Sequence, residues 1–196
     1  YGNVNNCYST IVKSDGMGLG GIAGRVYMGS PSIIENCYYL GKDISNGKVT
    51  SGIVSHLEMG VRIKHCMVFL ENISGGPNIR RIGCGERDPY YDDNYAWSGM
   101  KLNGNTVTDG ALNNDNGADV ELVDGKVYYN NAEFDWEANG FTEENGWVLP
   151  SRPYEMPKLK NDTAFPVLTL TQQAYSSIKI NETPQVFTYG DENIKF

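Results

Sequence analysis

Asn6-Cys7-Tyr8 is the first copy of the short pattern that decides the fold of this chain. The pattern returns as Asn36-Cys37-Tyr38, as His65-Cys66-Met67 and, more loosely, as Asn94-Tyr95-Ala96, so that one copy follows another every 29 or 30 residues. An aliphatic residue precedes each of the first three copies: Val4, Ile34 and Ile63. A fixed period of this size is typical of a solenoid, in which each repeat buries its apolar face only against its neighbours.

A second pattern repeats between these copies, and it is a short apolar step next to small residues. It reads Gly21-Ile22-Ala23-Gly24, then Gly52-Ile53-Val54-Ser55, then Arg81-Ile82-Gly83-Cys84. Runs such as Val61-Arg62-Ile63-Lys64 alternate apolar with polar residues, and a period of two indicates β-strands. We therefore expect three inward columns of stacked residues: Cys7 with Cys37 and Cys66, Val4 with Ile34 and Ile63, and Ile22 with Ile53 and Ile82.

A further row of residues is expected where each repeat turns. It contains Asn6, Asn36 and Asn94, with His65 in the third repeat. Asparagine suits a turn because it tolerates the left-handed backbone region and can hydrogen-bond to its copy one repeat away. We interpret His65 as a replacement for the asparagine of this row, because a metal-binding role would need a partner and His56 is the only other histidine.

The composition favours an all-β protein. The chain has 196 residues, of which 40% are hydrophobic and 20% charged, and this is enough for one sizeable core. The 23 glycines favour short strands joined by tight turns, because glycine weakens helices and permits left-handed turns. The sequence therefore predicts a parallel β-helix of 29 to 30 residues per coil, closed by a small mixed β module.

The charge balance narrows the range of partners. The chain has 24 acidic and 16 basic residues, a net charge of -8, which repels nucleic acid and anionic lipid headgroups. No apolar run approaches the roughly 20 residues of a membrane-spanning helix, so no membrane insertion of this segment is expected. Because the chain begins inside a repeat, without an initiator Met or a signal sequence, we expect it to be a piece of a longer polypeptide.

Four cysteines allow two interpretations. In an exported protein they suggest disulfides, and neighbouring positions of a stacked column lie within the range that a disulfide tolerates. However, three in-register thiols cannot all pair, and Cys84 lies outside the column of Cys7, Cys37 and Cys66. We therefore expect free thiols that pack as small apolar groups. The chain has no Cys-x-x-Cys pair, so no structural zinc and no other metal or cofactor is expected.

The segment from Asp88 to Trp97 is the candidate binding site. It combines acidic and aromatic residues, namely Asp88, Tyr90, Tyr91, Asp92, Asp93, Tyr95 and Trp97. Aromatic faces next to carboxylates are typical of sugar-binding surfaces, and a carboxylate pair is the machinery of glycosidases. Pro89 and the acidic density instead favour a solvated loop. Ligand binding, catalysis and a simple surface turn are all compatible with this segment.

The stretch Asn113-Asn114-Asp115-Asn116-Gly117-Ala118-Asp119 invites comparison with a calcium-binding loop, but it does not match one. With Gly117 at the invariant glycine, Leu112 takes the first ligand position and Val123 replaces the bidentate glutamate. A turn is the expected use of these residues. The nucleophile elbow of serine hydrolases and the His-Glu-x-x-His zinc motif are also absent from the sequence.

Residues 1–100 resemble the GLUG-motif repeat. The resemblance rests on Gly20-Gly21-Ile22-Ala23-Gly24, on Ile33-Ile34-Glu35-Asn36-Cys37-Tyr38, and on Ser51-Gly52-Ile53-Val54. This repeat occurs in secreted and surface proteins of bacteria, including adhesin-like proteins of gut anaerobes and the non-catalytic region of endopeptidases that cleave immunoglobulin A. The resemblance implies a right-handed β-helix and a secreted or outer-membrane-attached location.

The rest of the chain resembles the region on the C-terminal side of such repeats in these proteins. Residues 101–171 are expected to form a module that caps the open end of the β-helix. Residues 172–196 are expected to be a linker or the opening strands of a truncated immunoglobulin-like module, with strands at Ile178-Lys179-Ile180 and Phe187-Thr188-Tyr189-Gly190-Asp191.

The expected function is that of a non-catalytic, adhesin-like surface protein. A rigid acidic rod whose loops bear aromatic residues suits binding to a host or dietary glycan or to an extracellular protein. Two alternatives remain open. One is a polysaccharide-active β-helix enzyme that uses the acidic residues near 88–93, and the other is a spacer that projects a separate domain.

Overall fold

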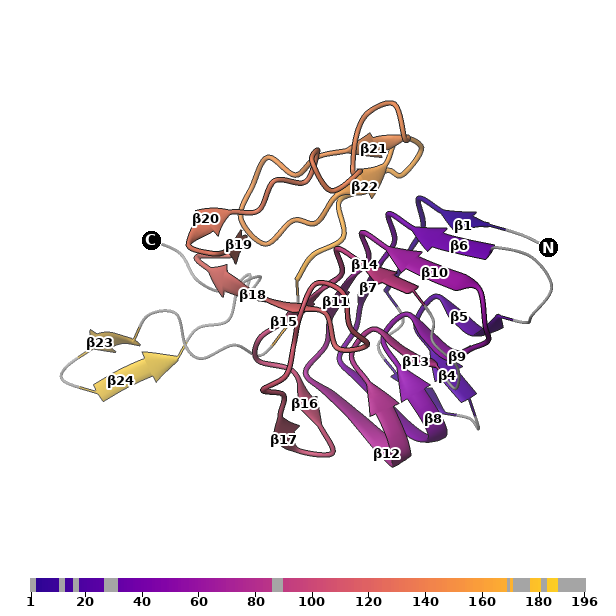
Figure 1. Ribbon diagram of the computed structural model, residues 1–196. Coiled ribbons are helices and arrows are strands. Elements are labelled where there is room, and N and C mark those ends of the chain that lie inside the picture. Colours follow the sequence, from indigo (N-terminus) through magenta and orange to yellow (C-terminus); the bar gives the residue numbers. More distant parts are fainter. Residues whose placement is uncertain are drawn as a thin grey trace.

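Strands make up all the regular structure that the computed structural model of this chain describes (Figure 1). The described residues are 3–10, 13–15, 18–26, 32–85, 90–168, 170, 177–180 and 183–186. No helix occurs in these ranges, and so none that is long and apolar enough to cross a membrane. The all-β class predicted from the sequence is confirmed.

Two sheets of parallel strands form one side of the body, and successive repeats add their strands to the same sheets. Sheet A consists of β1 (Val4–Asn5), β6 (Ser32–Glu35), β10 (Val61–Lys64) and β14 (Tyr90–Asp92). Sheet B begins with β2 (Tyr8–Ser9), β7 (Tyr38–Leu40), β11 (Met67–Phe69) and β15 (Tyr95–Trp97). It continues with β18 (Ala118–Val123), which pairs in parallel with β15, and with the antiparallel β19 (Lys126–Tyr129) and β20 (Ala132–Glu133).

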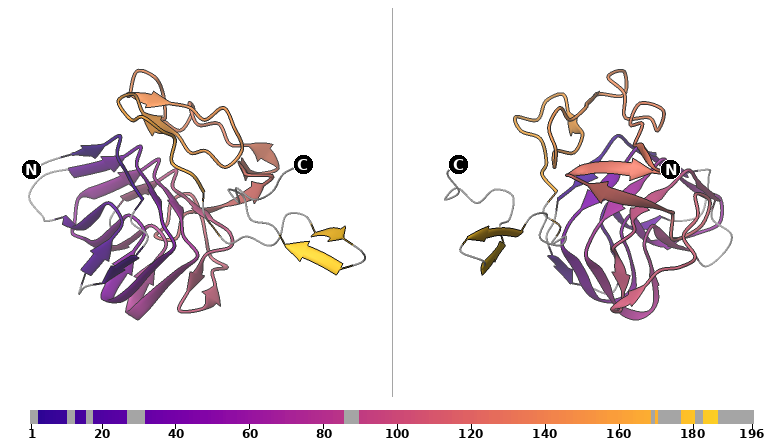
Figure 2. Two further views of the ribbon diagram at one scale, coloured as in Figure 1. Left: turned by 180° about the vertical axis from the view of Figure 1, so that it is seen from behind. Right: turned by 90° about the vertical axis from the view of Figure 1, so that its left-hand side faces the viewer.

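Two further sheets complete the body. Sheet C contains β3 (Lys13–Asp15), β4 (Gly18–Gly20), β8 (Asp43–Ser51), β12 (Asn72–Arg80), β16 (Lys101–Leu102) and β17 (Asn105–Thr106). Sheet D contains β5 (Ala23–Val26), β9 (Val54–Leu57) and β13 (Gly83–Gly85). Only the β16–β17 pair is antiparallel, and it turns through Asn103 and Gly104, both with positive φ. Figure 2 shows the strands of successive repeats lying side by side.

The strand registers confirm the predicted columns. In sheet A, Val4 pairs with Ile34 and Ile34 pairs with Ile63. Just before the strands of sheet D, the backbone N–H of Ile22 donates to the Ile53 carbonyl, and that of Ile53 donates to the Ile82 carbonyl. Ile34, Ile53, Ile63 and Ile82 are each at most 1% exposed, so the columns form the core.

The fourth repeat departs from the register predicted by the sequence. Tyr95 pairs with Met67 and thus continues the row of Tyr8 and Tyr38, rather than the cysteine column. Asn94 therefore takes the cysteine position, and Asp93 takes the turn position. The turn row is Asn6, Asn36, His65 and Asp93, all with φ between 49° and 54°. The expectation that Asn94 belongs to this row was wrong because the last repeat is one residue shorter.

The buried Asn94 side chain is hydrogen-bonded through both its nitrogen and its oxygen in its new position. Its amide nitrogen donates to the Ile63 carbonyl at 2.9 Å, and its amide oxygen accepts the backbone N–H of Cys66 at 3.0 Å. The stack of thiols thus ends in an amide that hydrogen-bonds back to the third repeat. All four cysteines are free in the structure.

Residues 134–168, which we call the strap, lie against the outer face of sheet B and reach the first repeat (Figure 1). The Tyr38 hydroxyl donates to the Pro157 carbonyl at 2.5 Å, and the Tyr8 hydroxyl donates to Asp162 at 2.6 Å. The strap contains the antiparallel pair β21 (Trp147–Val148) and β22 (Lys158–Leu159). Burial on both faces of β7, β11 and β15 explains this path, because an apolar outer face needs a cover.

The segment expected to cap the open end, residues 101–171, therefore covers both the end and one side of the stack. β18 adds to the end of the stack, whereas the strap turns back along its side (Figure 2). Aromatic rings fix the strap: the Trp147 ring centroid lies 5.8 Å from that of Tyr38 and 5.1 Å from that of Phe141. Trp147 and Phe141 are at most 1% exposed and so belong to the core.

The described residues beyond the strap include one hairpin. β23 (Ser177–Ile180) pairs antiparallel with β24 (Thr183–Val186). The strand predicted at Ile178–Ile180 is confirmed, and the strand predicted at Phe187–Asp191 lies outside the described residues.

Candidate functional site

The predicted binding segment is built mainly of strands rather than of a loop. Tyr90–Asp92 is β14 and Tyr95–Trp97 is β15, both paired in parallel with the preceding repeat. Asp88 and Pro89 lie outside the described residues. Two of the acidic residues that favoured a loop have regular positions in the stack. Asp92 lies in a strand, where it pairs with Lys64, and Asp93 follows His65 in the turn row.

Three of the four aromatic residues in this segment have roles in packing. Tyr91 continues the inward column of sheet A, and its hydroxyl donates to the Gly83 carbonyl at 2.7 Å. Tyr95 is 6% exposed and lies edge-on to Tyr129 and Phe134. Burial raises the pKa of Tyr95 to about 12. Trp97 is likewise 6% exposed, so neither ring offers a face to a ligand.

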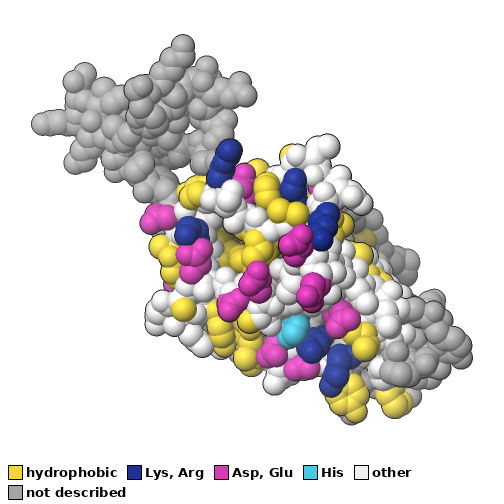
Figure 3. Space-filling view, turned by 90° about the horizontal axis from the view of Figure 1, so that it is seen from above, with side chains coloured by type: hydrophobic (Ala, Val, Ile, Leu, Met, Phe, Trp, Pro, Cys, Tyr) yellow, Lys and Arg dark blue, Asp and Glu magenta, His cyan; other side chains and the backbone are white. Residues whose placement is uncertain are grey.

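Tyr90 is the aromatic residue of the segment that faces solvent, with 62% of its surface exposed. It pairs with Arg62 on the outer face of sheet A. The face of the molecule seen from above carries acidic and basic side chains intermingled with apolar ones, without a patch of one sign (Figure 3). The net charge of -8 is thus not concentrated on that face.

Asp93 connects the predicted segment to a groove at the end of the stack. Its carboxylate lies 3.6 Å from Nε2 of His65, and its backbone N–H donates to Oδ1 of Asn113 at 3.2 Å. Burial, followed by the positive charge of Lys64, lowers the pKa of His65, although Asp93 and Asp92 act in the opposite direction. Asn113 in turn lines the groove.

This groove, which we call the Asn130 groove, has a volume of about 510 Å³ and is open to solvent. Its walls come from the loop before β18, from β18 itself and from the end of β19: Gly110, Ala111, Leu112, Asn113, Ala118, Asp119, Tyr129 and Asn130. Asp119 and Asn130 offer a carboxylate and an amide that are partly or fully exposed. Together with Leu112 and the half-buried Tyr129, these groups suit a ligand that has both hydroxyl groups and apolar faces.

Local backbone geometry places the polar groups of the groove. Asn130 and Asn131 form the turn between β19 and β20, and both have positive φ, which asparagine tolerates. The Asn114 side chain accepts the backbone N–H groups of Ala111, Asn116 and Gly117, and this holds the loop that forms the opposite wall. The sequence pointed to this loop only as a turn, and nothing local marked Tyr129 or Asn130 as lining residues.

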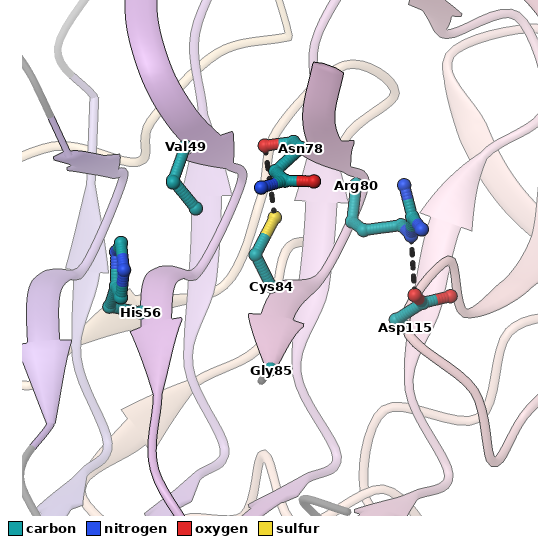
Figure 4. Close-up of a pocket in the computed structure, with 7 residues that line it drawn as sticks. All are labelled: Val49, His56, Asn78, Arg80, Cys84, Gly85 and Asp115. Atoms are coloured by element: carbon teal, nitrogen blue, oxygen red, sulfur yellow. Dashed lines mark hydrogen bonds and ion pairs between the residues drawn. The ribbon is translucent and has the colours of Figure 1, made fainter. Parts of the chain in front are cut away.

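A second cleft, the Arg80 cleft, lies beside sheets C and D and has a volume of about 260 Å³ (Figure 4). It is lined by Val49, His56, Asn78, Arg80, Cys84, Gly85 and Asp115. Nε of Arg80 donates to the Asp115 carboxylate at 2.5 Å, and the Cys84 thiol points to the Asn78 carbonyl at 3.4 Å. The opposite charges of Arg80 and Asp115 therefore neutralise each other within the cleft.

The chemistry available in the Arg80 cleft is limited. Burial raises the pKa of the Cys84 thiol to about 12, and Asp115 adds to this effect against the opposing charge of Arg80. Because the thiolate is the nucleophile, this shift makes Cys84 a poor nucleophile at neutral pH. The described lining residues include one carboxylate, Asp115, where a glycosidase would need two.

The described part of the chain contains no group of three or more His, Cys, Asp or Glu side chains arranged to hold a metal ion. His65 and His56 are not brought together, since the first stands in the turn row after sheet A and the second in β9 of sheet D. His65 replaces an asparagine of the turn row, as predicted.

No protein-family model matches the chain, and neither a curated protein nor a solved structure is similar enough to match it.

Proposed function

We propose that this chain is a right-handed parallel β-helix from a secreted or cell-surface bacterial protein of the GLUG-repeat type, with an adhesin-like, non-catalytic role. Among the four repeats, from β1 to β16, the parallel registers of sheets A to D advance by 28 to 31 residues, and this supports the β-helix. The resemblance of residues 1–100 to GLUG repeats supports the location. A rod closed along one side by the strap is suited to presenting a surface rather than to changing shape.

The observation that carries the binding role is the Asn130 groove. It combines a partly exposed aromatic ring, an aliphatic side chain, a carboxylate and side-chain amides around an open volume of about 510 Å³. Apolar faces with hydroxyl groups are the chemistry of a sugar ring, and amides and carboxylates are its usual hydrogen-bond partners. The ligand we propose is therefore a host or dietary glycan, which the groove would bind through one or a few sugar residues.

Neither the Asn130 groove nor the Arg80 cleft offers a pair of carboxylates, and this supports a non-catalytic role for these two sites. Asp119 is the one carboxylate among the described residues lining the Asn130 groove, and Asp115 is the one in the Arg80 cleft. Each is engaged by an arginine, Asp119 by Arg81 and Asp115 by Arg80. Hydrolysis of a glycosidic bond by the usual route needs a pair of carboxylates on opposite sides of the bond.

A spacer role is the second candidate, and the burial of Tyr95 and Trp97 favours it. Had these rings been exposed, the predicted segment would have formed an aromatic platform. With the rings in the core, the segment holds the repeats together, and binding depends on the Asn130 groove or on Tyr90.

The test is binding of the purified chain to immobilised mucin, plant and host-matrix glycans at physiological salt, with three variants. Asn130→Gly removes a side chain that lines the groove, and Asn131→Gly is its control because it lies in the same turn outside the groove. Both positions have positive φ, so glycine fits the backbone at either one. Tyr90→Ala probes the exposed ring on sheet A.

A glycan that binds wild type and Asn131→Gly but binds Asn130→Gly at least several-fold more weakly would support the proposal. Loss of binding only in Tyr90→Ala would move the site to sheet A. No binding to any glycan would favour the spacer.

A further inference from the structure

Three thiols lie in register at the centre of the stack. Tyr38 pairs with Tyr8 on one side and with Met67 on the other, so the preceding residues Cys7, Cys37 and Cys66 form one column across three strands. Their thiols share one orientation. Cys7 points to the Asn5 carbonyl at 3.2 Å, Cys37 to the Glu35 carbonyl at 3.1 Å, and Cys66 to the Lys64 carbonyl at 3.3 Å.

The spacing of this column fits a disulfide. Residues paired across neighbouring strands are about 4.8 Å apart. Disulfides join cysteines whose Cα atoms are about 4.4 to 6.8 Å apart, so the Cα spacing is already suitable. Because in-register side chains point the same way, their Cβ atoms need only a slight approach to reach the usual spacing of about 3.5 to 4.5 Å. The thiol of Cys37 also points to the Val4 carbonyl of the first repeat at 3.7 Å, and that of Cys66 points to the Ile34 carbonyl of the second repeat at 3.6 Å, so each thiol lies on the side that faces the preceding repeat.

Exposure distinguishes the two possible pairs in the column. Cys7 is half-buried at the outer end, whereas Cys37 and Cys66 are both 0% exposed. An oxidant the size of a small peptide can therefore reach the column only at Cys7. Cys84 stands apart in β13, where it lines the Arg80 cleft.

We propose that Cys7 and Cys37 are a modification site, at which a low-molecular-weight disulfide such as oxidised glutathione converts the two thiols into a disulfide that ties the first repeat to the second. The Cys7 thiolate attacks one sulfur of oxidised glutathione, which forms a mixed disulfide and releases one glutathione thiolate. The Cys37 thiolate then attacks the Cys7 sulfur and releases the second glutathione thiolate. The two protons pass to the two released thiolates, so that two protein thiols are oxidised and one glutathione disulfide is reduced.

The bond would act where the stack is weakest. Val4, Leu19, Ile22 and Val26 of the first repeat are only partly buried, whereas Ile34, Ile53 and Leu57 of the second are at most 1% exposed. The first repeat has a neighbour on one side among the described strands. A covalent bond to Cys37 would hold it in place when its strands open.

The experiment treats the full chain with oxidised glutathione, blocks the remaining thiols with an alkylating agent after denaturation, and digests the product with trypsin. Burial raises the pKa of the Cys7 thiol, and the hydrogen bond with Cys66 together with burial raises the pKa of the Cys37 thiol more strongly. The reaction is therefore run at alkaline pH with a long incubation. Cleavage after lysine and arginine places the cysteines on four separate peptides: 1–13, 26–42, 65–80 and 82–87. Mass spectrometry of the linked peptides then identifies the pair directly.

We expect peptides 1–13 and 26–42 to be joined, with Cys66 and Cys84 alkylated. The same pair should form in Cys84→Ser, and Cys7→Ser should retain Cys37 as an alkylated thiol. A joined pair of peptides 26–42 and 65–80, glutathione that remains attached to Cys7, or four alkylated cysteines would each overturn the proposal. The oxidised chain should also keep peptide 1–13 attached after limited trypsin digestion of the native protein, and this attachment should be lost on reduction.

Discussion

The Arg81 guanidinium donates from Nη1 to Oδ1 of Asp119 at 2.6 Å, although Arg81 stands where the earlier repeats have glycine. The backbone N–H of Gly21 donates to the Gly52 carbonyl, and that of Gly52 donates to the Arg81 carbonyl, so the three residues form one column. A Cβ at Gly21 would overlap the Tyr39 ring, and one at Gly52 would overlap Val68. In the last layer the equivalent of Tyr39 and Val68 is Ala96, and this small residue leaves room for the arginine.

The arginine closes the end of the stack. Besides Asp119, it donates to the carbonyl oxygens of Asn116 at 2.8 Å and Gly117 at 2.7 Å, and its side chain is 0% exposed. The backbone N–H groups of Ile82 and Asn94, which would have bonded to a further repeat, donate instead to the Asp115 and Leu112 carbonyls of the loop before β18. The arginine thus occupies the position of the stacking glycines and fastens the covering loop to the last repeat.

We expect Arg81→Ala to lower the free energy of unfolding by about 3 kcal/mol, because it removes a buried side chain and leaves two buried carbonyl groups without partners. Urea denaturation measures the change. Arg80→Ala is the matched control, since the Arg80–Asp115 pair is about 40% exposed and should contribute less than about 1 kcal/mol. Equal losses in the two variants would contradict the role assigned to Arg81.

Gly52→Ala should destabilise the chain by about 1 to 3 kcal/mol, because its Cβ would overlap Cγ1 of Val68 and approach the Arg81 carbonyl oxygen. Gly24→Ala provides the comparison. There the nearest atom to an added Cβ is the Gly18 carbonyl oxygen at 3.5 Å, an ordinary contact. The melting temperature of Gly52→Ala should lie clearly below that of Gly24→Ala. Equal melting temperatures would show that Val68 and the Arg81 backbone can move away from the added Cβ.

The 88–97 segment can be tested for packing directly. Trp97→Ala should lower the free energy of unfolding by about 3 to 5 kcal/mol, since the side chain is 6% exposed. Tyr90→Ala should change it by no more than about 0.5 kcal/mol, since that ring is 62% exposed. Denaturant titrations of both variants measure these changes. A Trp97→Ala variant as stable as the wild type would contradict the packing role and would make the Trp97 ring a candidate ligand contact again.

His65 should make stability depend on pH. Its pKa in the folded chain is below the ordinary value of 6.5, so the unfolded chain binds the proton more readily. The contribution is therefore complete above pH 6.5 and is lost as the pH falls through 6.5 toward the pKa of the folded state. We expect the urea midpoint of the wild type to fall between pH 8 and pH 6, and to fall less in His65→Asn, which restores the turn residue of Asn36. The same slope in wild type and His65→Asn would refute the assignment.

The sequence by itself determined the repeat, the all-β class and the inward columns of the first three repeats. These depend on local alternation and on a period that stacking reproduces directly, as the pairing of Val4, Ile34 and Ile63 demonstrates. It also identified the turn row, because Asn6 and Asn36 are residues that tolerate positive φ. In the fourth repeat the sequence pattern predicted the wrong turn residue. Asn94 matches the asparagine of the earlier copies, but Asp93 adopts the turn conformation with positive φ.

Only the tertiary structure decided which aromatic residues are core and where a groove opens. A sugar-binding platform is built of the same residue types as Tyr38, Tyr95 and Trp97. These side chains are nevertheless buried, because the strap and β18–β20, which are distant in sequence, pack on them. The Asn130 groove likewise joins residues from separate turns and strands. The physical reason is that alternation specifies which side chains share a face of a strand, whereas the exposure of that face depends on which distant segment packs on it.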